Sequence, residues 1–229
     1  MLSLVTVLVL SYIVGSIPGS LWSSKLLYGI DVREHGSGNA GATNTFRVVG
    51  WQAGVVATIV DMGKGAFAAG VLPMITLFGP FPAFGISAPG EAAVIVSLLC
   101  GLAAVTGHMF PVFAKFRGGK GVNTAAGILL ALTPLSTVLT MVVFVVTLAT
   151  SRYVSLGSIL ASIAFPTIVA VRKYVFGADL SVSLLVFGVV IGLAIVVAHQ
   201  SNIKRLLDGN ENRVSSFKPA EGMRGRGEI

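Results

Sequence analysis

Residues 180–198 read LSVSLLVFGVVIGLAIVVA and contain no charged side chain. An α-helix rises about 1.5 Å per residue, so about 20 apolar residues cross a hydrocarbon core about 30 Å thick. Six further stretches are similarly apolar, and they cover residues 2–18, 50–74, 91–106, 121–132, 134–150 and 154–171. This pattern predicts an all-α fold, a polytopic membrane bundle of about seven transmembrane helices.

The composition also indicates a membrane protein. Of the 229 residues, 54% are hydrophobic and 11% are charged, whereas an ordinary soluble domain has about 25% charged residues. So few charges cannot cover a water-facing surface, which excludes a soluble enzyme. The net charge is +7, yet Lys and Arg lie between the apolar stretches, so no nucleic-acid partner is expected. The single cysteine, Cys100, excludes an intramolecular disulfide.

The positions of Lys and Arg predict the orientation, because basic residues resist translocation. If the N-terminus is outside, the segments after the first, third and fifth apolar stretches hold most of the basic residues, together with the C-terminal tail. Only Arg172 and Lys173 violate the rule. We therefore predict an external N-terminus and a cytoplasmic C-terminus.

Two stretches need interpretation. Residues 121–132 are few enough to form a re-entrant segment, but seven spans put the polar loop before them and the polar tail on one face, and six do not. The first stretch lacks a basic region before it, so we interpret it as a retained helix that leads into a polar loop from residue 16. Residues 1–213 are expected to form one transmembrane domain, and residues 214–229 a disordered tail.

Three polar segments fall on the predicted cytoplasmic side. The first, residues 34–47, reads EHGSGNAGATNTFR. Closely spaced glycines let backbone N–H groups surround an anion, and Ser37 and Arg47 add donors for phosphate. A flexible loop with Asn-Gly turns and a threonine helix cap would also explain this composition.

The second segment, residues 107–124, reads GHMFPVFAKFRGGKGVNT. Gly118, Gly119 and Gly121 surround Lys120 at a predicted helix start, where free N–H groups and the helix dipole favour phosphate. The spacing of the nucleotide-binding P-loop is absent, so ATP and GTP are not indicated. The third segment, residues 199–211, reads HQSNIKRLLDGNE, and a helix there would put His199 and Asn202 on one face.

Asp61 and Lys64 are three residues apart in an apolar stretch and can pair on one helix face. Charges within a span are candidates for function, although a mutually neutralised pair packed in the bundle is an equal alternative. The chain has no Gly-x-Ser-x-Gly motif, no His followed five positions later by Asp, and no close set of metal ligands. Serine hydrolases, His-Asp acyltransferases and metalloenzymes are therefore disfavoured.

Taken together and in this order, the three segments resemble the bacterial acyl-phosphate:glycerol-3-phosphate acyltransferase family. The similar residues are Gly36-Ser37-Gly38-Asn39, Thr43-Asn44 and Arg47; Gly107-His108, Phe110-Pro111 and Gly118-Gly119-Lys120-Gly121-Val122; and His199, Asn202-Ile203, Arg205-Leu206, Gly209 and Glu211. The resemblance covers about residues 1–213. It departs from the family at Gln200, where Arg is usual, and at Asn123, where a small residue is usual.

The resemblance implies transfer of an acyl group from acyl phosphate to the 1-hydroxyl of sn-glycerol 3-phosphate, which gives lysophosphatidate and phosphate. It also implies a location in the bacterial inner membrane with the active site facing the cytoplasm. No cofactor, metal or obligate protein partner is expected beyond the two substrates and membrane lipid. A transporter or channel for a small anion is the competing class, and a structural membrane protein is a third.

The candidate site residues carry three kinds of expected role. Catalytic roles are assigned to Ser37, Arg47, His199 and Asn202. Substrate binding is assigned to Gly36, Gly38, Asn39, Thr43, Asn44, Lys64, His108, Gly118, Gly119, Lys120 and Gly121. Asp61 and Glu211 are expected to support the site. The proton acceptor is either His199 or an oxygen of the donor phosphate, and a covalent role for Ser37 is disfavoured because the sequence places no base beside it.

Overall fold

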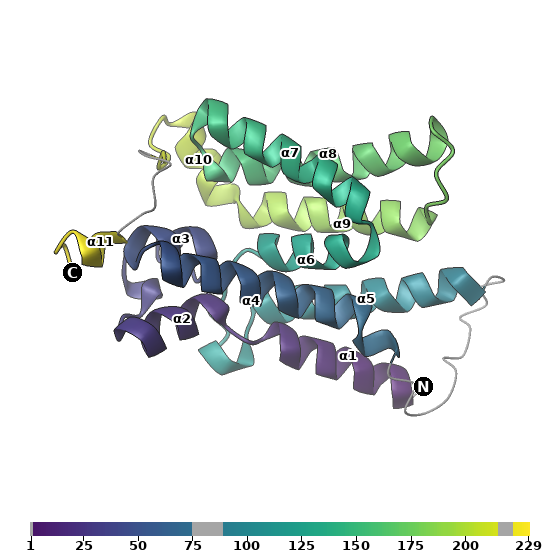
Figure 1. Ribbon diagram of the computed structural model, residues 1–229, viewed down its shortest axis with the longest axis horizontal. Helices are drawn as coiled ribbons and strands as arrows, with labels where there is room; N and C mark the ends of the chain where they lie inside the picture. The colour runs from purple at the N-terminus through teal and green to yellow at the C-terminus, as the bar shows by residue number, and fades with distance from the viewer. Residues whose placement is uncertain (1, 75–88, 215–221) are drawn as a thin grey trace.

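The computed structural model describes residues 2–74, 89–214 and 222–229, and within these residues every regular element is a helix (Figure 1). The α-helices are α1 (Leu2–Gly15), α2 (Gly19–Tyr28), α3 (Ala42–Val48), α4 (Trp51–Gly70), α5 (Pro89–Met109), α6 (Val122–Leu132), α7 (Pro134–Ser151), α8 (Val154–Tyr174), α9 (Val182–Ala198), α10 (Gln200–Leu207) and α11 (Gly222–Gly225). Short 3-10 turns are η1 (Val32–Glu34), η2 (Leu72–Met74) and η3 (Val112–Ala114).

The long helices lie with their axes roughly aligned, some parallel and some antiparallel, and form two groups (Figure 1). In one group α1 and α4 pack on α5, and in the other α7 and α9 pack on α8. Helix α6 lies between the groups and packs on α4, α5 and α7. The short helices α2, α3, α10 and α11 gather at the end of the bundle opposite the N-terminus.

The all-helical membrane fold predicted from the sequence is confirmed, and each of the seven apolar stretches contains a helix. Within the described residues, five helical segments are long and apolar enough to cross a membrane, or six if the bent pair α9–α10 counts as one span. Helix α6 has 11 residues, a length of about 16 Å that falls short of a hydrocarbon core about 30 Å thick. The count of seven spans and the orientation stay predictions.

The polar loop expected after the first helix was wrong in part, because this region contains α2 and α3. Polar side chains do not prevent α2 from forming, since the hydroxyls of Ser23 and Ser24 donate to the backbone carbonyls of Ser20 and Leu21. Gly29 ends the helix in a left-handed conformation, with φ of 72°. The sequence did not predict this helix because its three serines are typical of a loop.

Helices α4 and α6 approach each other at two glycines. A Cβ atom on Gly65 would collide with the carbonyl of Thr124, and one on Gly127 would collide with the carbonyl of Met62. Only glycine lets two backbones come this close. The contact brings the middle of α4, with Asp61, next to the start of α6.

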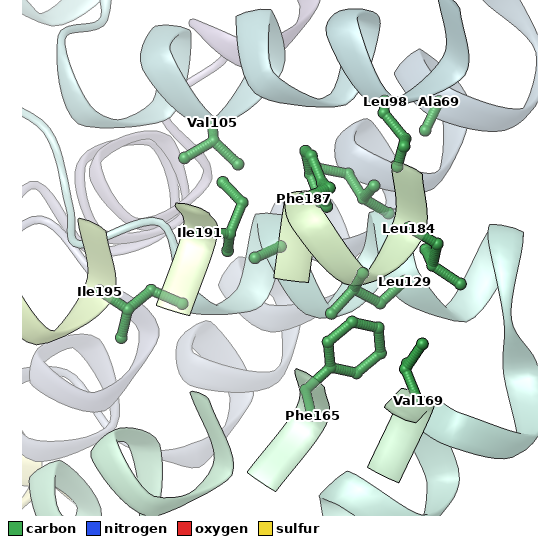
Figure 2. Close-up of a cluster of buried hydrophobic side chains, with 12 residues drawn as sticks. Ala69, Leu98, Val105, Leu129, Phe165, Val169, Leu184, Phe187, Ile191 and Ile195 are labelled. Atoms are coloured by element: carbon green, nitrogen blue, oxygen red, sulfur yellow. The ribbon is translucent and has the colours of Figure 1, made fainter. Parts of the chain in front are cut away.

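Buried apolar side chains from α4, α5, α6, α8 and α9 form the largest hydrophobic cluster of the described residues (Figure 2). Its members are Ala69, Leu98, Val105, Ala125, Ile128, Leu129, Phe165, Val169, Leu184, Phe187, Ile191 and Ile195. The cluster holds these five helices together in the interior of the bundle.

The C-terminal tail is described in part. Residues 215–221 of the predicted disordered tail lie outside the described residues. Beyond them α11 contacts α3, and Met223 packs against a small cluster that contains Val32, Val48 and Ala53. The domain boundary at residue 213 stays a prediction.

Candidate active site

One cavity of about 350 Å³ brings the three polar segments together, at the end of the bundle that carries α3 and α10 (Figure 1). The predicted residues on its wall are Ser37, Gly38, Asn39, Thr43, Asn44, Arg47, Asp61, His108, Lys120, Gly121, His199, Asn202 and Glu211. Gly36, Lys64, Gly118 and Gly119 are described by the structure but do not line this polar cavity. Their expected part in substrate binding stays a prediction.

The first polar segment is shaped by the side chain of Asn44. Its Oδ1 accepts the backbone N–H of Ser37 at 2.9 Å, and its Nδ2 donates to the carbonyls of Val32 at 2.8 Å and His35 at 3.0 Å. Gly36 lies against the same amide with φ of 62°, where a Cβ atom would touch Oδ1. The predicted loop therefore has a fixed form, and Asn44 holds it in place.

His199 presents one ring nitrogen to the cavity. It lies at the junction of α9 and α10, which are bent by 59° relative to each other. Its Nδ1 is 2.8 Å from the carbonyl oxygen of Ile195. A carbonyl only accepts, so Nδ1 donates its hydrogen there, and in the neutral ring the lone pair is on Nε2. His199 is buried and lines the cavity, so this arrangement suits a proton acceptor.

A hydrogen-bonded network joins the second segment to the third. Lys120 Nζ donates to Asn202 Oδ1, and Asn202 Nδ2 donates to Glu211 Oε1 at 2.7 Å. Glu211 also accepts from Ser155 Oγ at 3.0 Å and from Arg205 Nε at 2.7 Å. The carboxylate therefore orients an amide and a guanidinium at the cavity wall, which agrees with the supporting role expected for Glu211.

Burial changes the ionisation of these groups. The pKa of Lys120 is lowered to about 8, mainly by burial and also by the nearby charge of Arg205, while the charge of Glu211 opposes the change. Burial alone would raise the pKa of Glu211, but hydrogen bonds from Asn202, Arg205 and Ser155 bring it below its usual value. Burial also lowers the pKa of Arg47, although a guanidinium stays protonated in proteins. Three cations, Arg47, Lys120 and Arg205, and the carboxylate of Glu211 together give this part of the wall a positive charge.

Asp61, Lys64 and His108 form a buried cluster beside the cavity. Lys64 Nζ is 2.8 Å from Asp61 Oδ1 and 2.9 Å from His108 Nδ1, and it donates to the carbonyl of Ile17 at 2.7 Å. Because an ammonium only donates, Nδ1 of His108 is the acceptor. The ion pair expected from the spacing is present. The ammonium of Lys64 is engaged by these three groups, and its role in substrate binding stays a prediction.

Gly118 and Gly119 also act by close approach. A Cβ atom on Gly119 would collide with Nε2 of His108, and one on Gly118 would collide with the His108 carbonyl. These glycines let the loop before α6 lie directly on the histidine. The loop ends at Gly121, which has φ of 80° and precedes the first residue of α6. Lys120 is thereby held at the start of that helix.

A larger, apolar cavity of about 740 Å³ adjoins the polar one. Side chains of α4, α6, α7, α8 and α9 line it. Eight residues line both cavities, namely Ala42, Thr43, Arg47, Val122, Asn123, Phe144, Val154 and Ser158. The two spaces therefore meet along a shared wall that contains Arg47.

Several residues of the site were given no role in the sequence prediction. Ser155 holds Glu211 from a position 56 residues away, and no local pattern indicates this contact. Arg205 lies three residues after Asn202, so helical spacing was a usable signal for it. Asn123, Phe144 and Ser158 also line the polar cavity. Among the described residues, no three His, Cys, Asp or Glu side chains gather where they could hold a metal ion.

Comparisons with known proteins show which proteins this chain resembles. The family described as "Glycerol-3-phosphate acyltransferase" matches residues 5–209. A glycerol-3-phosphate acyltransferase of Salinibacter ruber is 61% identical over 230 residues, which cover 100% of both chains. One of Chlorobaculum tepidum is 48% identical over 231 residues, which cover 94% of this chain and 98% of the relative.

Solved structures are similar as well. The crystal structure of PlsY (YgiH), an integral membrane glycerol 3-phosphate acyltransferase in its glycerol 3-phosphate form, is 35% identical with a TM-score of 0.74. The match covers 94% of this chain and 98% of that one. The lysophosphatidic acid form of PlsY is 36% identical with the same TM-score, and the match covers 94% of this chain and 97% of that one.

Proposed function

The chain belongs to the glycerol-3-phosphate acyltransferase family and is a membrane glycerol-3-phosphate acyltransferase, and from this premise we propose that its acyl donor is an acyl phosphate. The products are then 1-acyl-glycerol 3-phosphate (lysophosphatidate) and inorganic phosphate. The observation that carries the proposal is the shared wall of a cationic cavity and an apolar cavity. An acyl phosphate fits across such a wall, because its phosphate is bonded directly to the carbonyl carbon of an apolar chain.

The proposed step is a direct acyl transfer. The 1-hydroxyl oxygen of glycerol 3-phosphate attacks the acyl carbonyl carbon and forms the new ester bond. The bond between that carbon and the phosphate oxygen breaks, and phosphate leaves with the electron pair. The hydroxyl proton passes to Nε2 of His199 or to an oxygen of the donor phosphate. Because acyl phosphate is already activated, the reaction needs no ATP, metal, cofactor or covalent serine.

The positions of the cations suggest how the two phosphates are bound. Arg47 lines both cavities, so it is suited to the donor phosphate, whose carbonyl must lie at their junction. Ser37 and Thr43 on the same side add hydroxyl donors. Lys120 and Asn202, which are hydrogen-bonded to each other beside His199, are suited to glycerol 3-phosphate. In this proposal Gly38, Asn39 and Gly121 complete the wall.

The proposed location of the protein is a bacterial inner membrane. The cavity is placed at the cytoplasmic face of a bacterial inner membrane, in agreement with the basic residues near it and the positive-inside rule. Both substrates and membrane lipid are partners, and no obligate protein partner is proposed. The variant Asp208→Cys in oriented vesicles tests this sidedness. A membrane-impermeant thiol reagent should label the introduced cysteine only from the cytoplasmic side.

Purified protein with palmitoyl phosphate, glycerol 3-phosphate and EDTA tests the reaction. We expect equal formation of phosphate and lysophosphatidate, insensitive to EDTA. Arg47→Lys is expected to lower kcat/KM by about tenfold or more, because lysine cannot replace a bidentate guanidinium. Phosphate release without lysophosphatidate would indicate hydrolysis. Activity with an acyl carrier thioester and not with acyl phosphate would overturn the donor assignment.

The pKa of Lys120 predicts a pH dependence. Lys120 is cationic below its pKa of about 8 and loses its charge above it, so kcat/KM for glycerol 3-phosphate is expected to fall as pH rises through about 8. The substrate does not cause this fall, because a phosphate monoester with a second pKa near 6 is already ionised there. Rates measured on both sides of pH 8 test this, since kcat/KM reports the free enzyme.

Lys120→Arg is the matched control for the pH profile, because a guanidinium keeps its charge throughout this range. Its kcat/KM is expected to be lower than that of the unchanged protein at neutral pH but flat through pH 8. A fall of the same size and midpoint in the Lys120→Arg variant would show that another group causes it.

A further inference from the structure

The apolar cavity follows one face of α8. Val154, Ser158, Ala161 and Phe165 lie on this face and line the cavity. Val154 and Ser158 also line the polar cavity, whereas Phe165 does not. The seven residues from Ser158 to Phe165 correspond to about 10 Å of helix. The apolar cavity therefore extends about this far from the junction.

Helix α7 gives the same depth independently. It runs in the opposite direction and lines the apolar cavity with Leu148, Phe144, Met141 and Thr137. Phe144 also lines the polar cavity, and Thr137 does not. These two residues are again seven positions apart, or about 10 Å. Two neighbouring helices thus place the far end of the cavity at the same level.

The far end is closed by the hydrophobic cluster. Figure 2 shows the ring of Phe165 beside Leu129 and Val169. Phe165 and Leu129 line the cavity, whereas Val169, one turn further along α8, is fully buried and does not. On α9, Ile191 lines the cavity and Leu184 lies in the cluster only. The cavity stops where close packing begins.

The ring of Phe165 is held by two neighbouring helices. It is 2% exposed, and a Cβ atom on Gly188 of α9 would lie 2.8 Å from it. The backbone of α9 therefore lies directly against the ring, and Leu129 of α6 packs beside it. A side chain held in this way does not yield easily to a longer ligand, because interiors are close-packed.

We propose that Phe165 is the stop that sets the preferred acyl-chain length of this enzyme. The inference rests on the proposed function, since it takes the apolar cavity as the site of the donor's alkyl chain. With the carbonyl at the junction near Arg47, the chain extends between α7 and α8 toward Phe165. Chains that reach the ring are held along their whole length, and longer ones must bend out of the cavity.

Ala161 offers a direct test. It lies four residues, or about 6 Å, nearer to the polar cavity than Phe165, on the same face of α8. An alkyl chain advances about 1.3 Å per carbon, given C–C bonds of about 1.5 Å. Ala161→Phe moves the stop by this distance without deleting any packed group, so we expect the preferred chain to become shorter by about five carbons.

The experiment compares kcat/KM for saturated acyl phosphates from butyryl to stearoyl phosphate. We expect Ala161→Phe to lower kcat/KM for octanoyl phosphate and longer chains by about tenfold or more and to leave butyryl phosphate within about twofold. Ile163→Phe is the control, because it adds the same bulk to α8 at a residue that is 54% exposed and outside the cavity. Its profile is expected to match that of the unchanged protein.

Phe165→Leu is the reverse variant, and it should favour longer chains. If the unchanged protein uses acyl phosphates but Ala161→Phe leaves the length profile unaltered, the chain leaves the cavity before Phe165 and the inference is wrong. If the unchanged protein uses no acyl phosphate of any length, the proposed donor itself fails. The two failures are therefore distinguishable.

Discussion

His199→Ala is expected to lower kcat by about 10²- to 10⁴-fold, the usual contribution of a positioned general base. The Nδ1 hydrogen is directed to the Ile195 carbonyl, which leaves the lone pair of Nε2 for the attacking hydroxyl. Glycerol 3-phosphate should still bind through Lys120 and its neighbours, so we expect its KM to change only a few-fold. Steady-state rates with palmitoyl phosphate measure both quantities.

His35→Ala is the matched control, because His35 belongs to the first polar segment but does not line the cavity. Its activity is expected to stay within about twofold of the unchanged protein. A loss of only a few-fold in His199→Ala would assign proton removal to an oxygen of the donor phosphate, and His199 would then serve only to orient the acceptor.

Asp61→Ala is expected to destabilise the fold by about 3–5 kcal/mol, because it leaves a buried ammonium without its carboxylate. Asp61 is 1% exposed and Lys64 is 5% exposed, so water cannot easily replace the lost partner. Thermal unfolding of the purified protein in detergent should show a lower Tm, and activity should fall as His108 loses its position.

The double variant Asp61→Ala/Lys64→Met separates charge from packing. It removes both charges, so we expect it to recover a large part of the lost stability. Glu228→Gln is the control for an exposed pair with Arg226, and it should change stability by less than about 1 kcal/mol. Equal Tm values for Asp61→Ala and the double variant would show that the buried charge is not the cause.

Local spacing accounts for the parts of this molecule that the sequence predicted well. The apolar stretches form helices, as expected from their length and hydropathy, because a membrane-spanning segment must satisfy its backbone hydrogen bonds internally. Asp61 and Lys64 pair because residues three apart share a helix face. The three polar segments meet because each follows or precedes a helix that ends on the same side of the bundle.

Contacts between distant residues account for what was missed. Ser155 donates a hydrogen bond to Glu211 only because α8 packs beside the end of α9. Nothing in the sequence near either residue indicates this contact. The sequence did not show that the amide of Asn44 holds the loop around Ser37. It also did not show that Lys64 lies beside His108 and the break between α1 and α2. Such roles depend on which polar groups still need a hydrogen-bond partner once the helices have packed.

The close approach of α4 and α6 limits how this sequence can drift during evolution or be improved by engineering. Replacing helical glycines with alanine usually gains about 0.5–1 kcal/mol. Gly63 has open space around its Cβ position, so it can accept that change. Gly65, two residues later, and Gly127 opposite cannot, because any side chain there pushes the two backbones apart. A side chain is thus tolerated at Gly63 but excluded at Gly65, which is half a helical turn away.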